Sequence, residues 1–282
     1  MQPKELTIST RQLTFSALEL GDPQGKPVIA LHGWMDNAAS FVPVAEQLKG
    51  IRLIAIDLAG HGRSEHRPKG WSYDIWHYIE DLSDIAEALK FNEFGLLGHS
   101  LGGIICTMSA ATVLKEQVTG LVVIDGISPY PRTPEESVSS LKQYIRQRRQ
   151  PVISLSEVGY RSIKQAIRAR MIGQYRVSKT SAELLVNRGL RQEESNWVWT
   201  MDPRLKLGSP ARYTLEQSLA FVKAVTCPMS IIYVEEGEIS EFVRDYAQDL
   251  TSAGLHPLAG SHHLHMDGQV DAVAAVINTT LS

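Results

Sequence analysis

The chain has 282 residues and a formal net charge of −3, and its 43% hydrophobic and 21% charged residues are typical of a folded globular protein. It has no fixed-period repeat, and glycines interrupt its one long uncharged run, residues 94–114, which favours a strand and a buried helix over a membrane span. Both cysteines, Cys106 and Cys227, lie among apolar residues, which favours reduced thiols in a cytoplasmic protein. No Cys/His cluster predicts a metal site, and the N-terminus lacks the apolar run of a secretory signal.

The charge is unevenly distributed along the chain. Residues 128–210 contain 15 Lys and Arg against 7 Asp and Glu, whereas the remainder contains 13 against 24. This asymmetry marks residues 128–210 as a separate basic segment. We expect it to dock on the acidic remainder; the alternatives are attraction of an anionic substrate or of an anionic membrane surface. The partner that we expect is a small-molecule substrate and not a nucleic acid.

In the first half of the chain, apolar and alternating patterns predict strands at Glu5–Thr10, Leu13–Leu20, Val28–Leu31, Arg52–Ile56, Phe94–Leu97 and Leu121–Ile124. Helical periodicity predicts helices at Ala39–Leu48, Tyr73–Lys90 and Ser100–Leu114. Strands that alternate with helices at this spacing indicate a mostly parallel sheet with helices on both faces.

The alternation stops at residues 128–210, where we expect a helical insertion without strands. Three Arg-rich, helix-like segments lie there, at Val138–Arg149, Tyr160–Tyr175 and Ser181–Leu190. The alternation then resumes with a helix, a strand, a helix, a strand and a final helix, at Leu215–Val225, Met229–Val234, Phe242–Leu250, Leu255–Leu258 and from Val270. We therefore expect one α/β core in two parts, residues 1–127 and 211–282, interrupted by the insertion.

Chemistry-bearing residues gather where the predicted strands end, which is where ligands bind in open parallel sheets. Ser100 lies in Gly98-x-Ser100-x-Gly102, between a strand and a helix. This is the nucleophile-elbow pattern, in which the turn is so tight that side chains two residues from the serine would clash. Ser100 is therefore the candidate nucleophile.

A serine hydroxyl needs a base to take its proton, and in this architecture the base is a histidine late in the chain. Three histidines follow the last predicted strand, at His262, His263 and His265. We rank them in that order, because His262 directly follows the Gly-Ser turn, whereas His265 is better placed to pack or to form a hydrogen bond.

The acid that orients the histidine is less obvious. Its usual place follows the strand Met229–Val234, where the expected position holds Gly237. Asp125, at the end of the preceding sheet strand, or the longer side chains of Glu238 and Glu235 could reach the histidine instead. We favour Asp125 because a buried strand holds it rigidly. Its role would be to fix the tautomer of the histidine and to stabilise the imidazolium.

Acyl transfer also needs N–H donors for the developing oxyanion. We predict that Leu101, directly after the candidate nucleophile, and Trp34, in the loop after the strand Val28–Leu31, supply them. Gly33 would let that loop approach closely. His32 and the Asp57 loop are expected to brace the pocket without taking part in the chemistry.

Four motifs in this order, HGW, DLAGHGRS, GHSLGG and GSHHLHM, resemble the α/β-hydrolase superfamily over nearly the whole core. HGWMDNAASF and HHLHM are most similar to its serine hydrolase-like proteins. The resemblance implies an eight-stranded sheet, a helical cap formed by residues 128–210 and no cofactor. It also implies Ser100 as nucleophile and His262 as base.

These observations favour a serine hydrolase that cleaves a carboxylic ester or thioester. Hydrolysis of C–C bonds and cofactor-free perhydrolysis would use the same residues. A binding protein that has lost catalysis is the third possibility, favoured only by Gly237. Trp197, Trp199 and Met201 could line an apolar acyl pocket or anchor the insertion to the core, and we expect a preference for apolar acyl groups.

Overall fold

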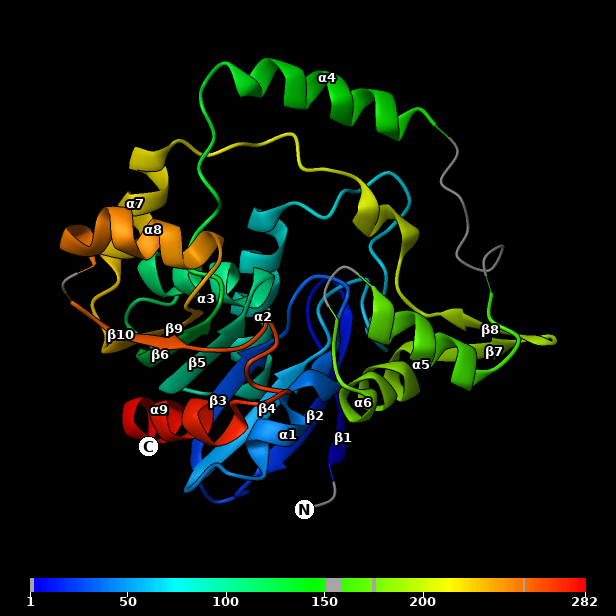
Figure 1. Ribbon diagram of the computed structural model, residues 1–282, viewed down its shortest axis with the longest axis horizontal. Helices are drawn as coiled ribbons and strands as arrows, with labels where there is room; N and C mark the ends of the chain where they lie inside the picture. The colour runs from blue at the N-terminus through cyan, green and yellow to red at the C-terminus, as the bar shows by residue number, and fades with distance from the viewer. Residues whose placement is uncertain (1–2, 151–158, 174–175, 251) are drawn as a thin grey trace.

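The structure, a computed structural model, describes residues 3–150, 159–173, 176–250 and 252–282. Within them lies an eight-stranded sheet in the order β1-β2-β4-β3-β5-β6-β9-β10 (Figure 1). Its strands are β1 Lys4–Ser9, β2 Thr14–Gly21, β3 Lys26–Leu31, β4 Ile51–Ile56, β5 Phe94–His99, β6 Val118–Ile124, β9 Met229–Val234 and β10 Ala253–Leu258. β2 is antiparallel to β1 and β4, and all the other pairs are parallel. The mostly parallel eight-stranded α/β fold expected from the sequence is confirmed.

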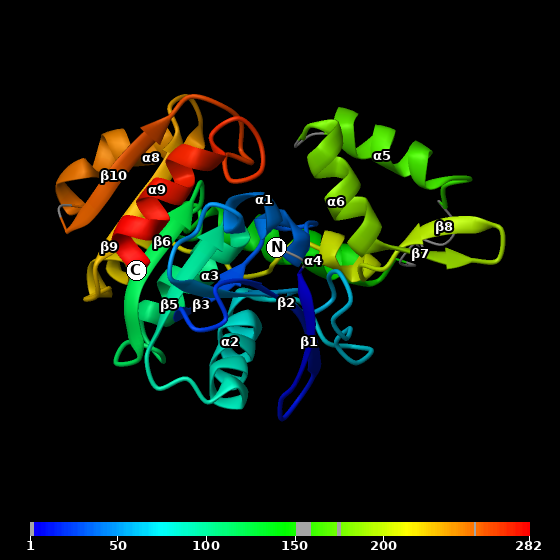
Figure 2. The same ribbon diagram turned by 90° about the horizontal axis from the view of Figure 1, so that it is seen from below.

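Helices cover both faces of the sheet, as expected. The helices of the core are α1 Val42–Ala45, α2 Ile75–Leu89, α3 Leu101–Ala111, α7 Leu215–Ala224, α8 Glu238–Tyr246 and α9 Val270–Leu281. One hydrophobic cluster joins the sheet to α2, α3, α7 and α8, and a second joins it to α1 and α9. Figure 2 shows α2 and α9 on opposite sides of the sheet.

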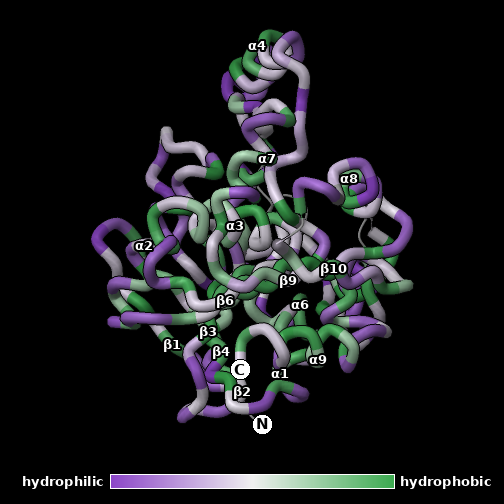
Figure 3. The backbone as a smooth tube through the Cα atoms, turned by 90° about the vertical axis from the view of Figure 1, so that its left-hand side faces the viewer, coloured by the Kyte–Doolittle hydropathy of each residue, from purple (hydrophilic) through white to green (hydrophobic). Residues whose placement is uncertain are grey.

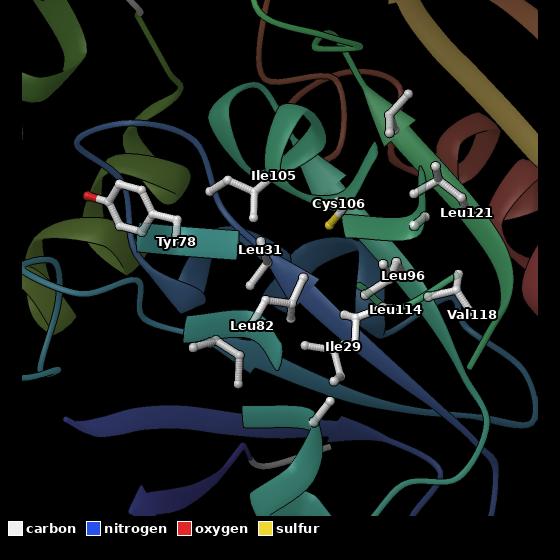
Figure 4. Packing of buried hydrophobic residues seen from close by; sticks show 14 of the residues in the cluster. Ile29, Leu31, Tyr78, Leu82, Leu96, Ile105, Cys106, Leu114, Val118 and Leu121 are labelled. Atoms are coloured by element: carbon white, nitrogen blue, oxygen red, sulfur yellow. The ribbon is translucent and has the colours of Figure 1, made fainter. Parts of the chain in front are cut away.

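The two clusters follow from the two-residue period of a strand. In β3, Ile29 and Leu31 belong to the first cluster, whereas Val28 and Ala30 belong to the second. Figure 4 shows side chains of the first cluster between the sheet and its helices, among them Cys106, whose buried thiol has a raised pKa. Figure 3 shows hydrophobic residues along the central strands and hydrophilic ones along many outer turns. Each fully buried aliphatic side chain contributes roughly 1.5–3 kcal/mol relative to an exposed one.

Between β6 and α7 the chain forms α4 Glu136–Arg148, α5 Ile163–Ile172, α6 Lys179–Gly189, β7 Leu190–Glu193 and β8 Asn196–Trp199. The expectation that this insertion lacks strands was wrong, because β7 and β8 pair as an antiparallel hairpin. Strands of four residues give too short an alternation to be recognised, and Glu194 makes the turn with a positive φ of 50°. The last two residues of the helix expected at Tyr160–Tyr175 lie outside the described residues.

The insertion does not form one compact unit. α4 stands away from the sheet in Figures 1 and 3, and it has no buried residue. α5, α6 and the hairpin lie together in Figures 1 and 2, and a third hydrophobic cluster joins α5 and α6 to Met266 of the C-terminal core. We call α5, α6, β7 and β8 the cap. The cap therefore docks directly on the loop that follows β10.

Two of the expected helices differ in extent. The helix expected at Ala39–Leu48 is a 3-10 turn, η1 Ala38–Phe41, followed by the single turn α1, with a proline at its start. α8 begins at Glu238, four residues before the expected helix, so this glutamate lies in a first helical turn and not in a loop. Carboxylates in the first turn of a helix are stabilised by its dipole. Among the described residues, no helix is long and apolar enough to cross a membrane.

Candidate active site

Ser100 occupies a sharp turn between β5 and α3. Its φ of 51° and ψ of −117° are strained for a residue with a side chain. A Cβ on Gly98 would lie 2.5 Å from the Gly102 carbonyl carbon, and one on Gly102 would lie 1.9 Å from the Leu31 carbonyl oxygen. The two glycines are therefore required sterically, as the elbow pattern predicts.

Asp125 and His262, which lie on separate segments of the core, are in contact. Asp125 follows β6 with a φ of 49°, and its Oδ2 lies 2.6 Å from His262 Nδ1. Because a carboxylate only accepts, the Nδ1–H donates this hydrogen bond. Asp125 is held on β9 as well, since its N–H donates to the Ile232 carbonyl and its Oδ1 accepts from the Val234 N–H. The structure thus places the preferred acid against the first-ranked histidine.

The alternative acids and histidines occupy other places. Glu235 and Glu238 are both exposed, and Glu238 lines a cavity together with Asp125. His263 and His265 are buried. His265 packs its ring 5.3 Å from that of Phe41, and burial lowers its pKa to about 3, so it is neutral.

His99, directly before the nucleophile candidate, was not singled out from the sequence. It is buried, and its Nε2 lies 2.9 Å from the His262 carbonyl oxygen, to which it donates. Burial, with further contributions from neighbouring histidines, holds the pKa of His99 well below its ordinary value, so the ring is neutral. His99 therefore ties the backbone of His262 to β5. Its place within GHSLGG was the only sequence signal for this role.

The loop after β3 approaches the elbow closely. A Cβ on Gly33 would lie 2.8 Å from His99 Nδ1, so only glycine fits without a shift. His32 braces this loop, since its Nε2 accepts from the Leu58 N–H at 3.0 Å and its Nδ1 donates to the Gly33 carbonyl at 2.7 Å. Burial lowers the pKa of His32 to about 4, so the ring stays neutral. His32 thus has the structural role expected from the sequence.

Of the two candidate oxyanion donors, Leu101 directly follows Ser100 in the chain and Trp34 shares a cavity with it. Leu101 is the first residue of α3, so its N–H has no acceptor within the helix. Trp34 and Ser100 line the same cavity, and the Trp34 ring is held by a 3.0 Å hydrogen bond from its Nε1 to the Leu205 carbonyl. The Leu101 N–H is therefore available to a ligand at Ser100, and Trp34 lies at the cavity that Ser100 lines.

Asp57 has the bracing role that the sequence predicts. It is fully buried, and it accepts hydrogen bonds from the Ala38 N–H at 2.7 Å and the Arg63 N–H at 2.9 Å. Arg188 of α6 pairs with the same carboxylate at 2.9 Å. Asp57 thus links two loops of the core to the cap.

Two cavities meet at Ser100 and His262. The cap-side cavity, about 300 Å³, is lined by the charged or polar residues Asp36, Arg170 and His263 and by a set of aromatic and other apolar residues, which are Trp34, Met35, Tyr160, Ala169, Trp199 and Met201. The second, about 390 Å³, lies toward α8 and includes Ile104, Tyr130, Glu238 and Ile239. A substrate whose reacting carbon lies at Ser100 can therefore extend in two directions.

The three residues of the insertion proposed for an acyl pocket have different positions. Trp199 and Met201 line the cap-side cavity, whereas Trp197 is not among its lining residues. Trp197 instead forms a backbone bridge with Tyr160, with both hydrogen bonds at 2.7 Å. The sequence left pocket and anchor roles open for all three, and the structure divides these roles between them.

One group of described residues brings three potential metal ligands together. Ligand atoms of Asp36, His99 and His263 lie within 4.8 Å of one another. However, Arg170 Nη2 lies 2.7 Å from Asp36 Oδ1 and 3.4 Å from His263 Nε2. A divalent cation would face electrostatic repulsion from this guanidinium. We therefore assign the cluster to an ion-pair network and not to a metal centre.

Comparison with known proteins gives a family match. Residues 26–167 match a family model described as "alpha/beta hydrolase fold". A protein of Drosophila melanogaster named "Probable serine hydrolase" is 31% identical over 283 residues, which cover 93% of this chain and 83% of that protein.

Solved structures are similar over nearly the whole chain. A hypothetical protein from Pseudomonas aeruginosa has 38% identity and a TM-score of 0.89, with 99% of this chain and 98% of that chain covered. A thioesterase domain from the curacin biosynthetic pathway has a TM-score of 0.86 at 22% identity, with 99% and 100% covered. The second likeness is one of fold alone.

Proposed function

This chain belongs to the α/β-hydrolase family, and we propose that it is a serine hydrolase that cleaves a carboxylic ester or thioester. The observation that carries the proposal is the 2.6 Å contact between Asp125 and His262, beside a serine in strained elbow geometry. Ser100 and His262 line the same two cavities. A shared cavity for the proposed nucleophile and base, with a carboxylate on that base, supports acyl transfer as the reaction.

The first chemical step is attack by Ser100 on the carbonyl carbon of the substrate. Asp125 accepts from Nδ1–H of His262, so the lone pair of this histidine is on Nε2, where it takes the Ser100 proton. The carbonyl π electrons move to oxygen as the new C–O bond forms. The resulting oxyanion accepts hydrogen bonds from the N–H groups of Leu101 and Trp34.

The intermediate collapses when its C–O or C–S bond to the leaving group breaks. His262 gives its proton to the departing alcohol or thiol, and an ester of Ser100 remains. Water, deprotonated by His262, then attacks this acyl-enzyme and releases the carboxylic acid. The Ser100 oxygen recovers its proton from His262, so the enzyme is regenerated.

The lining of the cap-side cavity supports a preference for apolar acyl groups. Trp199 and Met201 line it from the insertion, and Trp34 and Met35 line it from the core. About 300 Å³ corresponds to roughly ten water volumes, which suits a medium-length acyl chain. Charged acyl groups would lose hydration on entering it.

A binding protein without catalysis has less support. That alternative depended on Gly237, which occupies the usual place of the acid. Asp125 provides a carboxylate from the neighbouring strand, so Gly237 no longer implies an incomplete site. The position itself is open, since nothing lies within 4 Å of a Cβ built there.

The test is hydrolysis of p-nitrophenyl esters from acetyl to decanoyl, followed from the first turnover. We expect a burst of p-nitrophenol, an optimum at intermediate chain length, and loss of both in Ser100→Ala. A wild-type protein that turns over no ester or thioester and does not react with a fluorophosphonate probe would refute the proposal.

A further inference from the structure

Asp36 contacts three parts of the molecule whose relative positions matter for the proposed mechanism. It lies in the loop after β3, two residues beyond the oxyanion donor Trp34. Its Oδ2 lies 2.9 Å from Nε2 of His263, the neighbour of the proposed base. Its Oδ1 accepts from Arg170 Nη2 at 2.7 Å, and Arg170 belongs to α5 of the cap. One carboxylate thus connects the loop after β3, which we call the oxyanion loop, the loop after β10, which we call the histidine loop, and the cap.

The carboxylate of Asp36 is ionised and lies between His263 and the guanidinium of Arg170. Burial alone would raise the pKa of Asp36, but the contacts with His263 and Arg170 outweigh it and hold this pKa below its ordinary value. Asp36 is therefore ionised, and His263 donates its Nε2–H to it. His263 Nδ1 is buried without a partner among the described residues. Arg170, whose guanidinium is always charged, is a permanent cation beside the buried carboxylate.

Other contacts join the same parts of the molecule. Asn37, next to Asp36, donates from Nδ2 to the Leu185 carbonyl of α6 at 2.9 Å. Asp267 in the histidine loop accepts from the Ser178 N–H and the Ser181 hydroxyl at the start of α6. These polar contacts involve α6. From α5, Arg170 adds a charged contact to the hydrophobic packing of this helix against Met266, and its side chain is only 15% exposed.

We propose, on the basis of the proposed function, that Arg170 is a positioning residue for catalysis. Through Asp36 it fixes the backbone that carries the Trp34 N–H, and through His263 it fixes the loop that carries His262. Docking of the cap on the core therefore also fixes the positions of the Trp34 N–H and of His262. Because displacements of about 1 Å can cost on the order of 10²-fold in rate, the loss of this cation should lower kcat by a similar factor.

The experiment compares Arg170→Ala with Arg168→Ala, which removes an exposed arginine from the same helix. For Arg170→Ala on p-nitrophenyl butyrate, we expect kcat to fall on the order of 10²-fold and KM to change less than about threefold. The rate of fluorophosphonate labelling of Ser100 should fall with kcat. Millimolar guanidinium should restore part of the activity, because it replaces the missing cation, and urea should not. Arg168→Ala should match the wild type.

A conservative variant keeps the test valid if the alanine variant unfolds. Arg170→Lys keeps the charge without the planar fork of the guanidinium, so its kcat should lie between those of wild type and Arg170→Ala. Wild-type kcat in folded Arg170→Lys and Arg170→Ala would overturn the inference. A raised KM with unchanged kcat, or a loss that guanidinium does not rescue, would also overturn it. If the wild type neither hydrolyses esters nor is labelled, the proposed function itself fails.

Discussion

Replacing Asp125 by Asn tests the proposed acid with almost no change in volume. In the wild type, Oδ1 accepts from the Val234 N–H at 3.3 Å and Oδ2 accepts from His262 Nδ1 at 2.6 Å. The Asn oxygen must continue to accept from Val234, which turns its NH₂ group toward His262. His262 must then offer a bare Nδ1 and carry its proton on Nε2, where it cannot take the Ser100 proton. We expect kcat/KM to fall by about 10³–10⁴-fold, or roughly 4–5 kcal/mol.

The assay is steady-state hydrolysis of p-nitrophenyl butyrate at neutral pH, with thermal unfolding as a check on folding. Glu238→Gln is the matched control, since Glu238 lines the α8-side cavity and was the alternative acid. It should keep kcat/KM within about threefold of the wild type. A loss below tenfold in folded Asp125→Asn, with a large loss in Glu238→Gln, would refute the reasoning.

Three further predictions concern the cavity, the elbow and pH. Trp199→Ala should move the optimum of the acyl series to longer chains and Trp197→Ala should not; identical profiles for the two would count against the acyl pocket. Gly102→Ala should destabilise the fold by roughly 3 kcal/mol in chemical denaturation, because its Cβ would lie 1.9 Å from a carbonyl oxygen. Gly237→Ala is the control and should leave the stability unchanged, since nothing lies within 4 Å of a Cβ there. Equal stability of the two variants would contradict this. Three buried histidines have pKa values lowered to about 3–4, and they are His32, His61 and His265. Below about pH 6.5 the unfolded state therefore binds more protons than the folded state. The free energy of unfolding should fall by about 1.4 kcal/mol per histidine for each pH unit between pH 6.5 and pH 4. A free energy of unfolding that does not change with pH in this range would contradict the burial argument.

Much of the fold could be predicted from the sequence, because its core strands are short apolar runs bounded by turns. The run that ends at Ile124 and the one that ends at Val234 are buried by their neighbours, so local composition and final structure agree. The β7–β8 hairpin could not be predicted in this way. Its four-residue strands lie in the cap, where contacts with Tyr160 and the end of α6, and not local propensity, determine the structure.

The candidate site shows the same division. Ser100 could be recognised because the tight turn leaves no room for side chains at the glycines around it, and this requirement is local in the sequence. Asp125 could be proposed because neighbouring parallel strands end at the same edge of the sheet. Asp36 and Arg170 could not be paired, because 134 residues separate them and either would be an ordinary surface charge in isolation. Their contact exists only once the cap has docked on the core.

The central claim is that Ser100 attacks the substrate, and active-site labelling tests it most directly. The wild type and Ser100→Ala are each treated with a fluorophosphonate and mapped by peptide mass spectrometry. The account predicts one adduct, on Ser100, that forms in the folded wild type, is absent from Ser100→Ala and forms far more slowly in Asp125→Asn. A folded wild type that remains unlabelled, or an adduct on another residue that persists in Ser100→Ala, would contradict it.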